Sequence, residues 1–259
     1  MELIEVTQEG FVGSIVLDNP RKLNALSHDL VEGVIAALAR FAESDVRVVI
    51  LRARAGVKVW SAGHDVSELP EGRRDPLGWD DPLRNLVRTI ETHHNPVIAQ
   101  IEGGVWGGAV ETVLACDIVI ATPESTFAVT PARLGVPYNV SGMMTFMSAG
   151  SLRLVKELAF TAAPMAAERA ERIGMINHVV PAATIEVFTR EMAERIADNA
   201  PLSIRVMKEQ LRVLAGAKPV SPRGFEKVQG LRRVVYDSQD YAEGIRAFKE
   251  KRKPVFSGN

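Results

Sequence analysis

Apolar positions in the first part of the chain follow two patterns that predict strands. Leu3–Gln8 and Phe11–Asp18 alternate between apolar and polar residues, as half-buried strands do. Val48–Leu51 is a continuous apolar run, and Pro96–Ile101 is nearly so, which is typical of strands that are buried on both faces. The pattern therefore predicts a sheet whose middle strands are fully covered.

Helical spacing separates these strands. Ser27 caps a predicted helix whose apolar side chains recur once per turn over residues 31–41. Pro82 opens a second predicted helix, and short strands are predicted at 118–121 and 126–129. Because strands and helices alternate, the fold class is predicted as α/β, with a parallel sheet and crossover helices.

The chain changes character after Tyr138, where helical spacing dominates. Apart from a predicted strand at 176–180, residues 183–197 and 202–214 read as amphipathic helices. A last helix places three apolar side chains on one face: Tyr241, Ile245 and Phe248. A helical tail with more apolar faces than a small core needs is a candidate oligomer interface.

One internal segment carries no periodic pattern. Residues 71–81 are mostly polar and contain Gly72, Pro76 and Gly78. Such a composition predicts a mobile flap, which we expect beside the turn at Gly63.

Composition excludes several classes of partner. The 259 residues carry a formal net charge of -1, which gives no reason to expect nucleic acid or an anionic membrane. No apolar run reaches the length of a membrane span, and the first residues lack a basic signal-peptide head, so a cytoplasmic protein is expected. Cys116 is the single cysteine and has apolar neighbours, which indicates a packed, inert thiol. None of the five histidines has metal-ligand spacing, so no metal is expected.

Two glycine-containing turns stand out as candidate chemistry. Residues 101–117, IEGGVWGGAVETVLACD, read as strand, tight turn and helix, with Gly108 in the first helical turn. The first N–H groups of a helix have no partner within the helix, and glycine lets a ligand approach the backbone closely. A second such turn is SAGHD at 61–65. If the two turns face each other, each gives one N–H to the same oxygen, which forms an oxyanion hole.

Glu111 lies three residues after Gly108, so its side chain shares a helix face with the proposed donor. Its neighbours Val110, Val113 and Leu114 are apolar, which predicts a buried acid with acid–base capacity. The alternative is a structural role, because an acid is favourable in the first turn of any helix.

At these residues the chain resembles a known family. SAGHDVSEL, followed by EGGVWGGAVETVLACDIVIA, is similar to the crotonase (enoyl-CoA hydratase/isomerase) superfamily, and the resemblance extends from NPRKLNALS at 19–27 to FKEKRKPVF at the C-terminal end. SAGHDVSELPEG, RDPLGWDDPLR and TPARLGVPYN resemble the branch of biotin-independent methylmalonyl-CoA decarboxylases. The resemblance implies a ββα spiral core, taken as 1–198, and a C-terminal helical region, 199–259, that forms a homotrimer or a dimer of trimers.

The resemblance also implies roles for particular residues. The N–H groups of His64 and Gly108 occupy the family's oxyanion-hole positions, and Glu111 that of the first catalytic glutamate of the hydratases. The second falls on Pro131, which can neither give nor take a proton, so paired-acid hydration is not expected. Thr130 and Tyr138 resemble the residues around the substrate carboxylate in the decarboxylases.

Binding of the coenzyme A (CoA) part of the substrate is implied along the same stretches. The residues expected to bind it are Arg21, Lys22, Ser61, Ala62, Gly63, His64, Asp65, Val66, Ser67, Glu68, Gly107, Gly108, Thr130 and Lys251. Lysine suits phosphate as a point charge, although the basic run at 249–253 would serve equally as a solvated surface.

The resemblance implies decarboxylation of methylmalonyl-CoA to propionyl-CoA and CO2 without biotin or metal. Two alternatives stay open at this point. One is an enoyl-CoA hydratase or isomerase that uses Glu111 alone, and the other is a non-catalytic acyl-CoA-binding protein.

Overall fold

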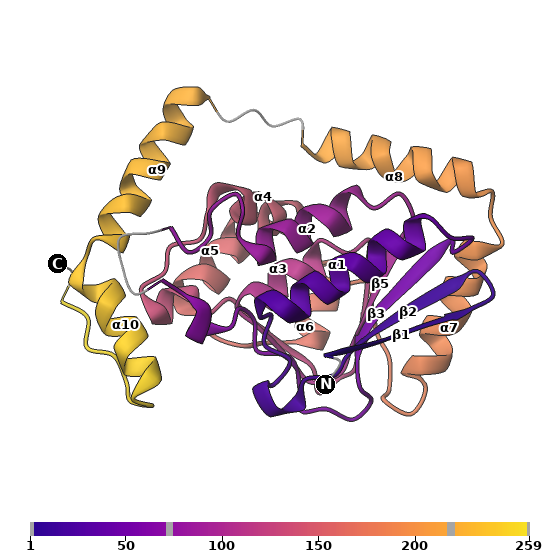
Figure 1. Ribbon diagram of the computed structural model, residues 1–259, viewed down its shortest axis with the longest axis horizontal. Coiled ribbons are helices and arrows are strands. Elements are labelled where there is room, and N and C mark those ends of the chain that lie inside the picture. Colours follow the sequence, from indigo (N-terminus) through magenta and orange to yellow (C-terminus); the bar gives the residue numbers. More distant parts are fainter. Residues whose placement is uncertain (1–2, 71–74, 217–220, 258–259) are drawn as a thin grey trace.

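The computed structural model describes residues 3–70, 75–216 and 221–257 (Figure 1). Its larger sheet has six strands in the order β1-β2-β3-β5-β7-β10, of which β1 and β2 are antiparallel and the others pair in parallel. These strands are β1 (Ile4–Glu9), β2 (Val12–Leu17), β3 (Val48–Ala53), β5 (Val97–Ile101), β7 (Ile118–Ala121) and β10 (His178–Val179). The predicted strands and the parallel sheet are confirmed, with β10 shorter than expected.

A second sheet of four short strands runs in the order β4-β6-β8-β9. They are β4 (Val59–Ser61), β6 (Gly104–Trp106), β8 (Thr126–Ala128) and β9 (Met165–Ala166). From β3 onward the strands come in consecutive pairs, β3/β4, β5/β6 and β7/β8. The first strand of each pair belongs to the large sheet and the second to the small sheet. This is the expected ββα spiral. The sequence pattern predicted β8 but not β4, β6 or β9, which have two or three residues each; β4 and β6 lie next to the glycine turns that were interpreted as turns only.

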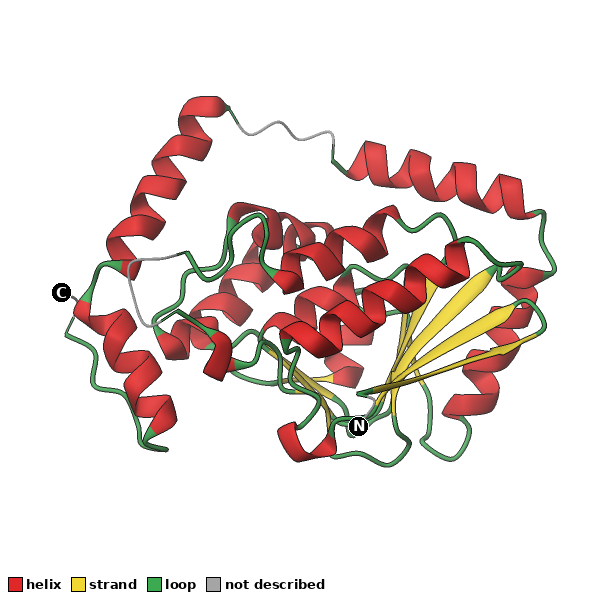
Figure 2. Cartoon of the chain, viewed as in Figure 1, coloured by secondary structure: helices red, strands yellow, loops and turns green. Residues whose placement is uncertain are grey.

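Helices cover both faces of the large sheet (Figure 2). On one face lie α1 (His28–Ala42), α2 (Pro82–Thr92) and α3 (Gly108–Leu114), which pack against side chains such as Val49 and Leu51. On the other face α7 (Ile185–Ala197) packs against Val48 and Ile50. Successive residues of β3 therefore point into two different cores, which explains its uninterrupted apolar sequence.

The remaining helices surround this body. They are η1 (Pro20–Lys22), η2 (Val66–Glu68), η3 (Pro131–Leu134), α4 (Val140–Ala149), α5 (Leu152–Thr161), α6 (Ala167–Arg172), α8 (Pro201–Ala215), α9 (Pro222–Tyr236) and α10 (Gln239–Lys249). Figure 1 shows α8 and α9 along the outside of the molecule. Within the described part of the chain, no helix is long and apolar enough to cross a membrane.

The apolar side chains of the C-terminal helices differ in how far they are buried. No side chain of Pro201–Ala215 is buried, and α8 contacts the body through Lys208, whose ammonium lies 2.7 Å from Asp117. Apolar side chains of α8 and α9 remain exposed, among them Leu202, Val206, Leu211, Leu214, Phe225, Val228, Leu231 and Val234. On α10, by contrast, Tyr241 and Ile245 are buried in the core of their own chain. Two of the three predicted residues of the α10 face therefore pack within the chain, while the third, Phe248, is 54% exposed.

The segment predicted as a mobile flap is held in place over its described part. Residues 71–74 lie outside the described residues, but Leu77 is buried in the main core and Asp75 pairs with Arg232 of α9. Asp81 caps α2, because its carboxylate accepts a hydrogen bond from the Arg84 N–H. Residues 75–81 thus have contacts with α9 and α2, and the Asp81 carboxylate lies 3.0 Å from the His64 Nε2, so the segment lies beside the turn as expected, while its mobility stays a prediction. Periodicity could not reveal anchors that come from distant helices.

A buried histidine follows α2. The Nε2 of His93 lies 3.1 Å from the Leu38 carbonyl oxygen, and its Nδ1 accepts a hydrogen bond from the Asn95 N–H. The ring stacks on that of His94, with 5.3 Å between centroids. Burial lowers the pKa of His93, so the folded protein holds this ring neutral at a pH where an exposed histidine is charged.

We expect the free energy of unfolding to decrease as the pH falls below about 6.5, the usual pKa of histidine. The unfolded chain binds protons at His93 from that pH downward, whereas the folded chain binds them only nearer its lowered pKa, so acid favours unfolding in this window. Urea denaturation at several pH values measures the effect. His93→Gln, which removes the titrating group, should show a weaker dependence on pH, and an undiminished dependence would contradict the assignment.

Candidate active site

The two glycine turns touch each other. Gly63 has φ +86°, a conformation that L side chains rarely adopt, and a Cβ there would lie 2.4 Å from the Trp106 carbonyl oxygen and 2.9 Å from the Gly108 nitrogen. Only a residue without a side chain allows this approach. The turn at 61–65 is therefore closed directly onto the start of α3.

The closeness brings two amide groups together. Gly107 precedes α3 with φ +54°, and Gly108 is the first helical residue. A Cβ on Gly108 would lie 3.6 Å from the His64 nitrogen. Neither the His64 nor the Gly108 N–H donates a hydrogen bond to another described residue. Two neighbouring unpaired donors are suited to one negatively charged oxygen, as an oxyanion hole requires.

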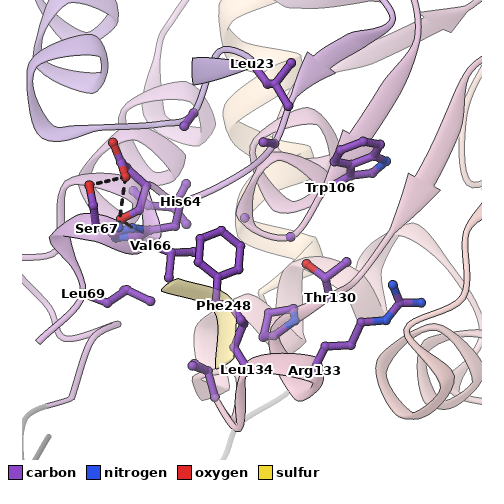
Figure 3. Close-up of a pocket in the computed structure, with 18 of the residues that line it drawn as sticks. Leu23, His64, Val66, Ser67, Leu69, Trp106, Thr130, Arg133, Leu134 and Phe248 are labelled. Carbon is purple, nitrogen blue, oxygen red and sulfur yellow. Dashed lines mark hydrogen bonds between the residues drawn. The ribbon is translucent and has the colours of Figure 1, made fainter. Parts of the chain in front are cut away.

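These amides border a cavity of about 840 Å³ (Figure 3). In Figure 3, Val66, Trp106, Thr130 and Phe248 line it from η2, β6, the loop before η3, and α10. Twelve of the residues predicted for the site line the cavity: Arg21, Lys22, Ala62, His64, Asp65, Val66, Ser67, Gly107, Gly108, Thr130, Tyr138 and Lys251. The structure thus gathers residues from six separate parts of the chain around the two amides.

Four predicted site residues are not part of the cavity lining. The Ser61 hydroxyl donates to the Asn24 carbonyl oxygen at 2.7 Å, and the Glu68 carboxylate accepts from the His28 N–H at 2.9 Å. Gly63 acts by letting the two turns approach. The fourth, Glu111, lies in the protein interior. The first three shape the loops that carry the lining residues.

Glu111 is paired with a cation that the sequence reading did not identify. Its side chain is 0% exposed, and its Oε1 accepts a hydrogen bond from Arg84 of α2, which is also buried. The other oxygen, Oε2, has no hydrogen-bond partner in the described part of the chain. Because the guanidinium stabilises the carboxylate, Glu111 is not the isolated buried acid that its neighbours indicated. The available signal was the position of Arg84, three residues before Val87 on the buried face of α2.

Tyr138 presents a buried hydroxyl group to the site. Its ring meets that of Phe146 edge-on at 5.0 Å, and a Cβ on Gly142 would lie 2.6 Å from its Cδ1, so the ring is tightly packed. None of the described residues forms a hydrogen bond with the hydroxyl. Burial raises the pKa of Tyr138, so it remains a protonated donor at neutral pH. An unsatisfied buried donor in a cavity wall is suited to a polar ligand.

Thr130 lies beside the amide pair. A Cβ on Gly107 would come within 3.1 Å of its hydroxyl oxygen, and Pro131, the next residue, also lines the cavity. Thr130 precedes η3, and among the described residues its hydroxyl makes no capping hydrogen bond to the start of that helix. The hydroxyl therefore lies close to the oxyanion position without being used as a helix cap.

The His64 imidazole has a fixed environment of its own. Its Nε2 lies 3.0 Å from the Asp81 carboxylate, and its Nδ1 lies 3.2 Å from the Asp65 carbonyl oxygen. Burial favours the neutral ring, but the hydrogen bond and charge of Asp81 outweigh it, and the pKa of His64 is raised. The ring is thus held as a support for the turn whose N–H faces the cavity.

The cavity also has residues that sequence reasoning missed. Apolar side chains dominate them, namely Leu23, Leu69, Leu77, Leu83, Trp106, Leu134, Val136 and Phe248. Among the cations, Lys22 pairs with Asp65 at 2.7 Å, and Lys251 has φ +55° just after α10. The described residues contain no cluster of three or more His, Cys, Asp or Glu that could hold a metal ion.

Comparison with known proteins gives consistent matches over the whole chain. A family model described as enoyl-CoA hydratase/isomerase matches residues 7–259. A methylmalonyl-CoA decarboxylase of Escherichia coli (strain K12) is 47% identical over 258 residues, covering 100% of this chain and 99% of that protein. An enoyl-CoA isomerase/hydratase of Mycosarcoma maydis is 30% identical, covering 94% of this chain and 92% of that protein.

Solved structures agree with these sequence matches. A methylmalonyl-CoA decarboxylase in complex with 2-nitronate-propionyl-CoA superimposes with a TM-score of 0.98 at 47% identity, covering 100% of this chain and 99% of that one. The same values hold for a methylmalonyl-CoA decarboxylase complexed with 2S-carboxypropyl CoA.

Proposed function

The chain belongs to the enoyl-CoA hydratase/isomerase family, and from that premise we propose that it decarboxylates methylmalonyl-CoA to propionyl-CoA and CO2. The observation that carries the proposal is the combination of two free amides and an unpartnered Tyr138 hydroxyl in one largely apolar cavity. Similarity to the decarboxylase of Escherichia coli, at 47% identity over the full chain, supports it.

The amides of His64 and Gly108 stabilise the negative charge that develops in the reaction. When the bond between C2 and the carboxylate carbon breaks, its electron pair enters the thioester and CO2 leaves. Charge then builds on the thioester oxygen, where each N–H donor contributes about 3–4 kcal/mol at the transition state. A proton added at C2 completes propionyl-CoA.

The carboxylate end of the substrate lies against Tyr138 and Thr130. The Tyr138 hydroxyl has no partner among the described residues, and the Thr130 hydroxyl makes no cap bond to η3, so each can donate a hydrogen bond that orients the carboxylate. The surrounding side chains, such as Leu77 and Leu83, are apolar. An apolar environment disfavours the carboxylate relative to neutral CO2, which helps the bond to break.

Hydration of an enoyl-CoA, the first alternative, fits these residues poorly. Pro131 stands where the hydratases have a second acid, and Glu111 is held by Arg84 outside the cavity lining. A general base must reach its proton, directly or through one water. Glu111 accordingly acts as a structural acid that secures α3 to α2. The second alternative, binding without turnover, uses the same hydroxyl groups of Tyr138 and Thr130 to hold the substrate, and release of CO2 distinguishes it from decarboxylation.

The CoA part of the substrate extends along the polar side of the cavity. The main chain of 62–67 follows the pantetheine, as in the family, and Arg21, Lys22 and Lys251 face the phosphates. Lys22 pairs with Asp65 at 2.7 Å while its side chain stays 55% exposed, so the ammonium is accessible from the cavity. The reaction requires no biotin and no metal, because the thioester itself accepts the electron pair.

The C-terminal helical region, 199–259, mediates assembly into a homotrimer or a dimer of trimers in the cytoplasm. Exposed apolar side chains on α8 and α9, such as Leu211 and Leu231, support this role because they form faces that the chain leaves uncovered. The preceding residues, 1–198, form the spiral core.

Release of CO2 from purified protein and methylmalonyl-CoA tests the proposal directly. We expect Tyr138→Phe to lower kcat by about 10- to 100-fold, because one hydrogen bond to a charged group is worth about 1.5–3 kcal/mol. The ring is retained, so packing against Phe146 is unchanged. Full turnover by Tyr138→Phe would remove the role of this hydroxyl. Hydration of crotonyl-CoA without release of CO2 from methylmalonyl-CoA would overturn the function itself.

A further inference from the structure

A buried guanidinium connects the C-terminal helices to the cavity wall. Arg232 of α9 is only 4% exposed and donates to both carboxylate oxygens of Asp75, at 2.6 and 2.7 Å. It also donates to the Tyr236 hydroxyl oxygen at 2.6 Å and to the Gln229 side chain at 2.9 Å. A bidentate, buried pair of this kind fixes geometry as well as contributing energy.

Tyr236 passes this constraint to the loop that carries Tyr138. Its hydroxyl donates to the Pro137 carbonyl oxygen at 3.3 Å, one residue before Tyr138. Burial raises the pKa of Tyr236, which keeps the hydroxyl protonated as a donor. Its ring is itself fixed by an edge-on contact with Tyr241 at 5.6 Å.

The other side of Tyr138 is held by the same segment of chain. The Asn139 side-chain amide donates to the Leu77 carbonyl oxygen at 3.0 Å, two residues after Asp75. Pro137 is therefore hydrogen-bonded to α9, and Asn139 to the segment 75–77, which is itself paired with α9 through Asp75. The Tyr138 ring packs against Phe146, its hydroxyl has no partner among the described residues, and its main chain is held on both sides by these neighbours.

We propose that Arg232 and Tyr236 are positioning residues that place the Tyr138 hydroxyl for the substrate carboxylate. This inference rests on the proposed function, since it assigns them an effect on the chemical step through Tyr138. The alternative is that α9 only contributes stability. A structural role lowers activity equally whether or not the Tyr138 hydroxyl is present, whereas a positioning role acts through that hydroxyl alone.

A double-mutant cycle between Tyr236→Phe and Tyr138→Phe separates the two. Tyr236→Phe removes the bonds to Pro137 and Arg232 but keeps the ring on Tyr241. We expect it to lower kcat about tenfold with KM unchanged, because a small displacement of a reacting group is costly. In the Tyr138→Phe background, the same change should alter kcat by less than about twofold.

Matched variants guard against a general loss of folding. Arg232→Lys and Asp75→Asn act from the other end of the network and should lower kcat in the same direction. Arg233→Lys, at a neighbouring position of α9 whose side chain is 74% exposed, should leave kcat unchanged. Urea midpoints of all variants show whether stability follows kcat.

The outcomes distinguish this inference from the proposed function. If Tyr138→Phe loses activity but Tyr236→Phe lowers kcat by the same factor in both backgrounds, the positioning role is refuted and the function stands. If Tyr236→Phe alone leaves kcat at the wild-type value, the positioning role is equally refuted. A silent Tyr138→Phe would refute the role of Tyr138 and this inference together, even if CO2 is released.

Discussion

Replacing Gly108 by proline should reduce the kcat for decarboxylation by about 100- to 1000-fold, since it deletes one of the two N–H donors. Proline suits the first position of a helix, where its missing N–H breaks no helical bond, so α3 should still form. The rate of CO2 release at saturating methylmalonyl-CoA measures the loss. The effect belongs to the transition state, where negative charge on the thioester oxygen is greatest, so kcat should fall more than binding.

Gly108→Ala is the matched control for this variant. Both substitutions introduce a Cβ 2.4 Å from the Leu83 Cδ2, which must move aside, but alanine keeps the N–H. The ratio between the two variants therefore separates the replacement of the N–H by the proline ring from the effect of the added Cβ. Equal activity of Gly108→Pro and Gly108→Ala would show that this amide does not stabilise the enolate.

Arg84→Met should be the most destabilising single change near the site. Removing one partner of a buried ion pair leaves the other charge uncompensated, which costs about 3–5 kcal/mol of unfolding free energy. Glu111 is fully buried and already has one oxygen without a partner, so it has no other cation to pair with among the described residues. Urea denaturation of the wild type and the variant measures the difference.

The double variant Arg84→Met/Glu111→Leu tests the cause of that loss. With both charges replaced by apolar side chains, much of the stability should return, because the isolated carboxylate is gone. If the double variant is less stable than Arg84→Met alone, the ion pair is not the origin of the effect. CO2 release by a stable double variant would also confirm that Glu111 is not needed for the chemistry.

The two glycine turns of the site could be predicted from local sequence, whereas Thr130, Tyr138 and Lys251 were implied by the family resemblance. Gly63 has a positive φ, and at both Gly63 and Gly108 the backbone lies too close to other atoms for a side chain. Glycine itself is a sign of such positions, so they can be suspected from the sequence alone. The start of α3 at Gly108 and the cap at Ser27 follow from neighbouring residues in the same way. For this reason the amide pair could be placed from the sequence.

The parts that were missed depend on contacts between distant segments. Arg84 meets Glu111 only after α2 and α3 pack together, and no pattern within either helix names its partner. Asp75 lies in a segment without periodicity, yet Arg232, far along the chain, holds it in place. Phe248 had the spacing of an interface residue but reaches the cavity wall. Local sequence pattern indicates that a residue is buried or functional, but its contact partners are set by the packing of distant segments.

Helix α9 has one face packed against the body of the protein and one exposed face. Arg232 and Tyr236 point inward to the loop that carries Tyr138, while Leu231 and Val234 face outward and are uncovered within the chain. If neighbouring copies of the chain cover that outer side, the same helix takes part in the subunit interface and in placing Tyr138 for decarboxylation. A compound that binds to the outer side of α9 and displaces the helix would then slow turnover without entering the substrate cavity. Such an inhibitor need not resemble a thioester.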